Sequence, residues 1–129
     1  MAGSSQPTNS ELAILDVLWR RGPSTVRDVF EVLQQQKDVG YTTILKTMQN
    51  MHGKSILHRD DARRPHIYWH AQPPESVQEG LIASLARRAF GGSAANLVLR
   101  ALSGGTTSRS DLRAIRDLID EMEASRGEE

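Results

Sequence analysis

The segment Tyr41–Met51 constrains this chain most, because its apolar residues repeat with the period of one helical face. Ile44, Thr47, Met48 and Met51 recur at positions i, i+3, i+4 and i+7. The opposite face has one cation and no carboxylate, and it consists of Thr42, Thr43, Lys46, Gln49 and Asn50. Short hydroxyl and amide side chains suit a surface that approaches phosphates and base edges. The same pattern also fits an ordinary amphipathic helix, so the flanking segments have to decide.

Length and composition limit the possible classes of protein. The chain has 129 residues, 38% of them hydrophobic and 25% charged, which predicts either one standard globular domain or a small domain plus an oligomerisation segment. The net charge is zero, but residues 41–70 contain five Lys/Arg and only two Asp/Glu. Cysteine is absent, which excludes disulfides and thiolate metal sites. We find no signal peptide and no apolar run of about 18 residues, so we expect a cytoplasmic protein without a membrane anchor.

Two further helices are predicted before Tyr41. Residues 1–7 are expected to be a flexible tail, and Thr8–Glu11 then has the spacing of a capping box. The first helix ends at Gly22-Pro23, and its predicted apolar set is Leu12, Leu15, Val17, Leu18 and Trp19. A second cap at Thr25–Asp28 begins a helix to about Gln36, with an apolar face of Val26, Val29, Phe30 and Leu33. A short connection then leads to the Tyr41 helix, as in a helix-turn-helix whose second helix reads DNA.

A β-hairpin is predicted after the third helix. Ser55–Arg59 and His66–His70 are rich in β-branched and aromatic residues, and a polar turn at Asp60–Pro65 joins them. The order of three helices and a hairpin is that of a winged helix-turn-helix, here spanning residues 8–71. Arg63 and Arg64 at the tip of this wing are expected to meet phosphates.

The four histidines all lie between positions 52 and 70. His66 and His70 share one strand face, and His58 is expected to lie opposite them on the neighbouring strand. With His52, this cluster suggests either a metal site or a proton switch near neutral pH. The alternative is that these histidines are polar residues on the exposed side of a wing, and we predict no metal site. Trp19, Trp69, Met48 and Met51 are predicted to be core residues.

The region 74–125 is predicted to form three amphipathic helices, broken at Gly91-Gly92 and Gly104-Gly105, with a frayed tail at 126–129. Three short helices cannot form a second core alone, so we expect them to pair with a second copy of the chain. The alternative is that they pack back onto the N-terminal domain. The predicted dimer interface is Leu81, Leu85, Leu97, Leu102, Leu112, Ile115, Leu118, Ile119 and Met122.

Taken in order, these motifs resemble the penicillinase-repressor family of winged-helix regulators, which includes β-lactamase, methicillin-resistance and copper-responsive repressors. The resemblance covers residues 8 to about 123. It is carried by Glu11–Trp19, Gly22–Val29 and Tyr41–Ile44, with weaker support from His66–Tyr68 and from Phe90–Ser93 between two helices. It implies a homodimer that represses transcription from a palindromic operator. It also implies that the C-terminal helices form the dimer and that the major groove is faced by Thr42, Thr43, Lys46 and Asn50.

Several residues depart from the usual family pattern. A small or hydroxyl residue is usual in place of Lys46, Arg in place of Asn50, and an apolar residue in place of Thr47. Ser55 stands where a glycine is usual, so Gly53 is expected to make the turn after the third helix. In the antibiotic-responsive members induction cleaves an Asn-Phe bond, but Arg100-Ala101 occupies that position here. Copper-responsive members sense the metal with C-terminal cysteines, so the absence of cysteine excludes that mode. The sequence assigns no upstream sensor or protease.

No catalytic motif is recognisable, and we predict neither an enzyme nor a cofactor. The favoured interpretation is a dimeric, sequence-specific repressor with operator DNA and itself as partners. The alternative is a winged-helix module that binds protein without reading DNA sequence. The candidate DNA-contacting residues are Thr25, Arg27, Tyr41, Thr42, Thr43, Lys46, Asn50, Arg63 and Arg64.

Overall fold

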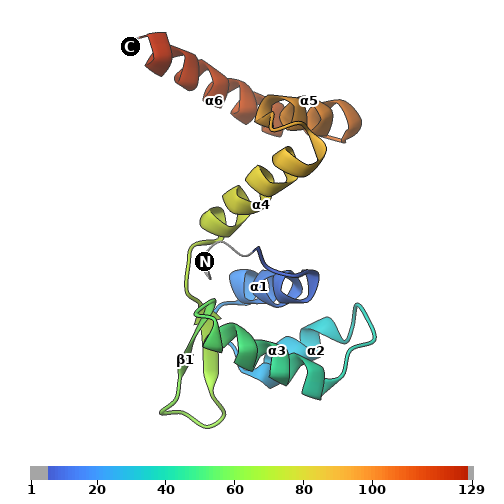
Figure 1. Cartoon of the computed structure of the whole chain (residues 1–129), viewed down its shortest axis with the longest axis vertical. Coiled ribbons are helices and arrows are strands. Elements are labelled where there is room, and N and C mark those ends of the chain that lie inside the picture. The colour runs from blue at the N-terminus through green and yellow to red at the C-terminus, as the bar shows by residue number, and fades with distance from the viewer. Residues whose placement is uncertain (1–5, 128–129) are drawn as a thin grey trace. The chain divides into compact units, whose positions relative to one another are not determined.

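The computed structural model of the chain describes residues 6–127 (Figure 1). Most of the predicted flexible tail and the last two residues, Glu128 and Glu129, lie outside the described residues. The chain divides after Leu81 into an N-terminal unit and a C-terminal unit. Residues 6–127 form six helices and one two-stranded antiparallel sheet, so the predicted class, mainly helical with a small hairpin, is confirmed.

Helix α1, Asn9–Arg21, begins at the predicted capping box. The Thr8 hydroxyl accepts a hydrogen bond from the Glu11 amide at 3.1 Å, and the Glu11 carboxylate accepts one from the Thr8 amide at 2.9 Å. The predicted apolar set was partly wrong. Ile14, which was not in the set, is fully buried, whereas Leu12 and Trp19 only pack partly against the core.

Helix α2, Val26–Leu33, has the second predicted capping box. The Thr25 hydroxyl accepts from the Asp28 amide, and the Asp28 carboxylate accepts from the Thr25 amide. That backbone hydrogen bond from Thr25 keeps the pKa of Asp28 below its usual value. The helix ends three residues earlier than predicted. The three glutamines after Leu33 have no apolar side chain to bury, and the chain leaves the helix there in a turn.

Helix α3, Tyr41–Gly53, begins at the predicted residue and has the predicted core face. Ile44, Met48 and Met51 are buried, and Met48 and Met51 have no exposed surface. Thr47 is only partly buried, and its hydroxyl donates a hydrogen bond to the Thr43 carbonyl at 2.8 Å. A helix held in the core by three apolar side chains presents its opposite face in a fixed orientation.

The turn after α3 is made by Ser55 and not, as the sequence suggested, by Gly53. Ser55 has φ +65°, in the left-handed region, while Gly53 lies in the last turn of the helix. The Ile56 amide donates to the Met51 carbonyl at 2.9 Å, and the Ser55 amide donates to the His52 carbonyl at 3.0 Å. These two bonds form a Schellman motif, in which glycine usually occupies the left-handed position.

Replacing Ser55 with glycine should therefore raise the free energy of unfolding by about 0.5–1 kcal/mol, because glycine adopts this conformation without steric cost. Urea denaturation followed by circular dichroism measures the change. Ser10→Gly, placed in the first turn of α1, is the matched control and should lower stability instead. Destabilisation by Ser55→Gly would contradict the proposed backbone strain.

The hairpin consists of β1, Leu57–Asp60, and β2, Ile67–His70. β1 begins two residues and ends one residue later than predicted, and β2 begins one residue later. Tyr68 pairs with Arg59 across the hairpin and is almost fully buried. The backbone of Tyr68 also exchanges two hydrogen bonds with Ser24, at 3.0 and 2.8 Å. This bridge fastens the hairpin to the connection between α1 and α2.

An ion pair joins the start of α1 to the end of α3. Lys54 Nζ lies 2.6 Å from Glu11 Oε2, and the Glu11 side chain is only 7% exposed. Burial raises the pKa of Glu11, but hydrogen bonds from Lys54 and from the Thr8 backbone outweigh it, so the net pKa is lowered. The stabilisation is therefore present above the usual pKa of an unfolded glutamate and is lost as pH falls through the lower, folded-state value.

Three helices follow the hairpin, with breaks at the predicted glycine pairs. They are α4, Pro74–Ala89, α5, Ala94–Gly104, and α6, Arg109–Gly127. Helix α6 continues to Gly127, where fraying was expected from Arg126. Neither α5 nor α6 buries any residue in the single chain. None of the helices described is long and apolar enough to cross a membrane.

Candidate nucleic-acid interface

The face of α3 that points away from the core carries the predicted reading residues. Thr42, Thr43, Lys46 and Asn50 are all exposed. Gly40 caps the helix without any side-chain hydrogen bond, and the first turn contains no acidic residue. The first backbone N–H groups of α3 therefore remain available to donate hydrogen bonds to an acceptor outside the protein. The positive end of the helix dipole lies at the same place. This arrangement is favourable for an anion such as a DNA phosphate.

Arg27 on α2 and Tyr41 on α3 lie together in an aromatic cluster. The rings of Phe30 and Tyr41 meet edge to face with centroids 5.6 Å apart. The guanidinium carbon of Arg27 lies 5.0 Å from the centre of the Tyr41 ring. Such cation–π contact restricts a long side chain that would otherwise move freely. Thr25, the remaining candidate near this cluster, uses its hydroxyl to cap α2.

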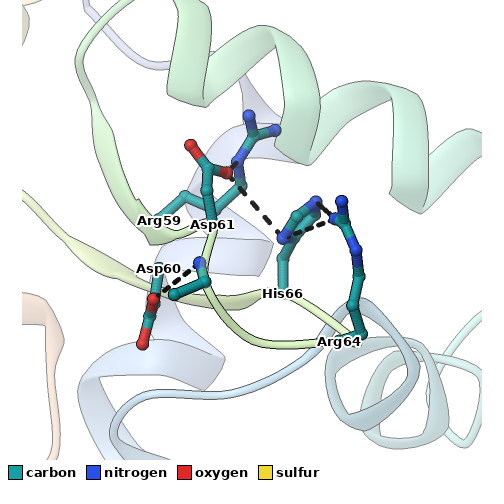
Figure 2. A network of polar contacts seen from close by, with 6 residues as sticks. Arg59, Asp60, Asp61, Arg64 and His66 are labelled. Atoms are coloured by element: carbon teal, nitrogen blue, oxygen red, sulfur yellow. Dashed lines mark hydrogen bonds and ion pairs between the residues drawn. The ribbon is translucent and has the colours of Figure 1, made fainter.

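The wing tip contains both exposed cations and a local polar network (Figure 2). Arg63 and Arg64 are exposed, as predicted. Arg59 is paired with Asp61, and hydrogen bonding from Arg59 lowers the pKa of that carboxyl. Asp60 accepts a hydrogen bond from the Ala62 amide at 3.0 Å and so stabilises the turn.

The five cations of residues 41–70 therefore divide into those that form an ion pair and those that do not. Lys54 forms an ion pair with Glu11, and Arg59 forms one with Asp61. Within residues 6–127, Lys46, Arg63 and Arg64 form no ion pair with a carboxylate. Sequence reasoning counted all five cations alike, because the carboxylate that occupies Lys54 is 43 positions away.

The predicted grouping of the histidines is wrong in one respect. The strand register pairs His58 with Trp69, and their ring centroids are 5.7 Å apart. His70 pairs with Leu57 and lies on the other face of the hairpin. Among the described residues, no three His, Asp or Glu side chains gather closely enough to hold a metal ion. Trp69 is only partly buried and is not a core residue, whereas Tyr68 is.

Comparison with known proteins agrees with this geometry. The profile of the Penicillinase repressor family matches residues 7–121. The chain belongs to the penicillinase repressor family. Two relatives, each named transcriptional regulator BlaI, come from Mycobacterium tuberculosis strains CDC 1551 / Oshkosh and ATCC 25618 / H37Rv. Each is 29% identical to this chain over 98% of its length and 92% of the relative's.

Membership of the penicillinase repressor family assigns the chain to transcriptional repression and not to catalysis. The winged-helix order of the N-terminal unit is the one that the resemblance implied. The exposed face of α3 and the wing carry the residues that the sequence predicted to contact DNA.

Proposed function

We propose that this repressor acts as a homodimer on a palindromic operator, with α3 in the major groove and the wing on the DNA backbone. The observation that carries the proposal is the exposed, carboxylate-free face of α3, together with a wing whose two exposed arginines form no ion pair with a carboxylate among residues 6–127. Lys46 and Asn50 are the residues proposed to contact base edges. The proposed backbone contacts are Thr25, Arg27, Tyr41, Thr42, Thr43, Arg63 and Arg64.

In this proposal, residues 8–71 bind DNA and residues 74–125 form the dimer. Support comes from the apolar surface of the C-terminal helices. Leu118, Ile119 and Met122 on α6 are each 47–55% exposed, and Val98 on α5 is 46% exposed. Large apolar side chains exposed at helical spacing are usually covered by a partner. A second copy, related by two-fold symmetry, also matches the two half-sites of a palindrome.

Binding of random duplex DNA, followed by sequencing of what is retained, tests this function directly. The expected result is a two-fold symmetric consensus and an affinity that falls steeply with salt, because phosphate contacts release counterions. Retention of no preferred sequence at low salt would instead favour a winged-helix module that binds protein.

Two substitutions separate base reading from backbone contact. Lys46→Ala should weaken binding to the selected consensus by about 1–3 kcal/mol and relax the preference at one base position. Arg63→Ala should weaken binding to all sequences alike and lower the salt slope by about one. Fluorescence anisotropy with matched and mismatched duplexes measures both effects. Equal binding of the consensus by Lys46→Ala and the parent protein would refute the assignment of α3 as the reading helix.

A further inference from the structure

A pocket of about 170 Å³ lies between α2, α3 and the wing, inside the N-terminal unit. Its apolar walls include Val26, Leu45 and Tyr68. Gln49 also lines the pocket and belongs to the exposed polar face of α3, one residue from Asn50. The pocket therefore adjoins the surface proposed to enter the major groove.

Two arginines and one histidine, from two separate elements, converge on this pocket. Arg27 comes from α2, whereas Arg64 and His66 come from the wing. Among the described residues, no carboxylate lines the pocket. Apolar walls with two arginines and an imidazole match a sugar-phosphate unit, which has an apolar sugar and an anionic phosphate. An arginine fork binds phosphate oxygens with directed hydrogen bonds.

The contact between Arg64 and His66 depends on the protonation state of the imidazole. Arg64 Nη1 lies 2.8 Å from His66 Nε2, and Figure 2 shows the two side chains pointing toward each other. Arginine has only donors, so His66 Nε2 accepts this hydrogen bond only when it carries no proton. When His66 gains a proton on Nε2, it no longer accepts from Arg64, and both side chains are cationic donors at the pocket.

The charged and titratable groups around His66 come from all the elements packed near it. Asp61 Oδ1 lies 3.8 Å from His66 Nδ1, and Arg64 Nη1 lies 2.8 Å from His66 Nε2. Arg27 on α2 and Tyr41 on α3 line the same pocket. Arg59 on β1 is paired with Asp61, and His52 on α3 also acts on the Asp61 carboxylate. A phosphate in the pocket would add an anion that favours the protonated form.

We propose that this pocket holds one phosphate of the DNA backbone, and that His66 is its third cation, taken up with a proton on binding. The inference rests on the proposed function, since it places a phosphate-binding pocket and a proton taken up on binding at the same DNA interface. Neutral His66 holds Arg64 by accepting its hydrogen bond, and protonated His66 releases Arg64 toward the phosphate. Binding that takes up one proton tightens as pH falls, by at most about tenfold per pH unit.

The experiment uses the full chain and a random-sequence 30-base-pair duplex, because a backbone contact does not depend on sequence. Affinity is measured at pH 6 and pH 8 at constant ionic strength. The parent protein should bind about five- to tenfold more tightly at pH 6. His66→Gln should reduce this difference to about twofold or less. His66→Lys, which keeps a permanent cation, should bind at pH 8 about as tightly as the parent binds at pH 6.

His58→Gln is the matched control, because His58 lies beside Trp69 on the opposite hairpin face and does not line the pocket. It should keep the parental pH dependence. The inference is overturned if His66→Gln keeps that dependence, or if His58→Gln loses it equally. It is also overturned if His66→Lys gains nothing at pH 8. Failure of the proposed function looks different, since the parent itself would then bind duplex without a steep salt dependence.

Discussion

Replacing Tyr68 with alanine is expected to lower the free energy of unfolding of the N-terminal unit by about 3–5 kcal/mol. Tyr68 is the largest fully buried side chain, at 1% exposure. Its ring lies nearly perpendicular to the His52 ring on α3, with centroids 6.5 Å apart, and its backbone is bridged to Ser24. Loss of the ring therefore leaves a cavity where the wing, α3 and the α1–α2 connection meet. Urea denaturation followed by circular dichroism measures the loss.

The neighbouring aromatic residue provides the control for this prediction. Trp69 points to the other face of the hairpin, lies against His58 and is only partly buried. Trp69→Ala should cost less than about 1 kcal/mol, although tryptophan is the larger side chain. If both variants lost the same stability, the assigned strand register would be wrong, because a shift of one residue exchanges the two faces.

Replacing Ile119 with aspartate is expected to convert the proposed dimer into a monomer and to weaken operator binding at least about a hundredfold. Ile119 is 47% exposed on α6, in one stripe with Leu112, Ile115 and Met122. A carboxylate buried in an apolar interface is strongly unfavourable. A monomer loses the second half-site, whose binding is otherwise intramolecular and worth about 10²–10⁴ in affinity. Light scattering measures the mass, and fluorescence anisotropy measures the affinity.

Ala124→Asp places the same charge on the opposite face of α6, where the residue is exposed. This variant should remain dimeric and bind the operator like the parent protein. A parent protein with the mass of one protomer at micromolar concentration would contradict the proposed role of α4 to α6. Dimerisation that survives Ile119→Asp would place the interface elsewhere.

Much of the candidate DNA interface was predictable because α3 is defined by local spacing. Ile44, Met48 and Met51 face the core, so Lys46 and Asn50 are directed outward by helical geometry alone. The sequence predicted a hairpin in this region. It did not predict that Tyr68 is buried in the core and that Trp69 is not. Both aromatic residues lie in the same strand, and only the pairing register decides which one faces the core.

The turn after α3 shows a different limit of sequence reasoning. Gly53 was the residue expected to make it, because glycine adopts left-handed backbone most easily. The helix instead continues through Gly53, and Ser55 takes the left-handed conformation. Leu57, which is 1% exposed, must enter the core shortly after this turn. This requirement sets the position of the turn, and the local preference of one residue does not.

The sequence by itself determined the features that depend on residues within about four positions of one another. These are the two capping boxes at Thr8 and Thr25, the period of α3 and the glycine breaks between the C-terminal helices. Only the tertiary structure decided the pairs that are distant along the chain, such as Glu11 with Lys54 and Ser24 with Tyr68. The pocket that gathers Arg27, Arg64 and His66 is of this second kind. Helical period and capping are local hydrogen-bond geometry, whereas contacts between elements depend on how their buried faces pack.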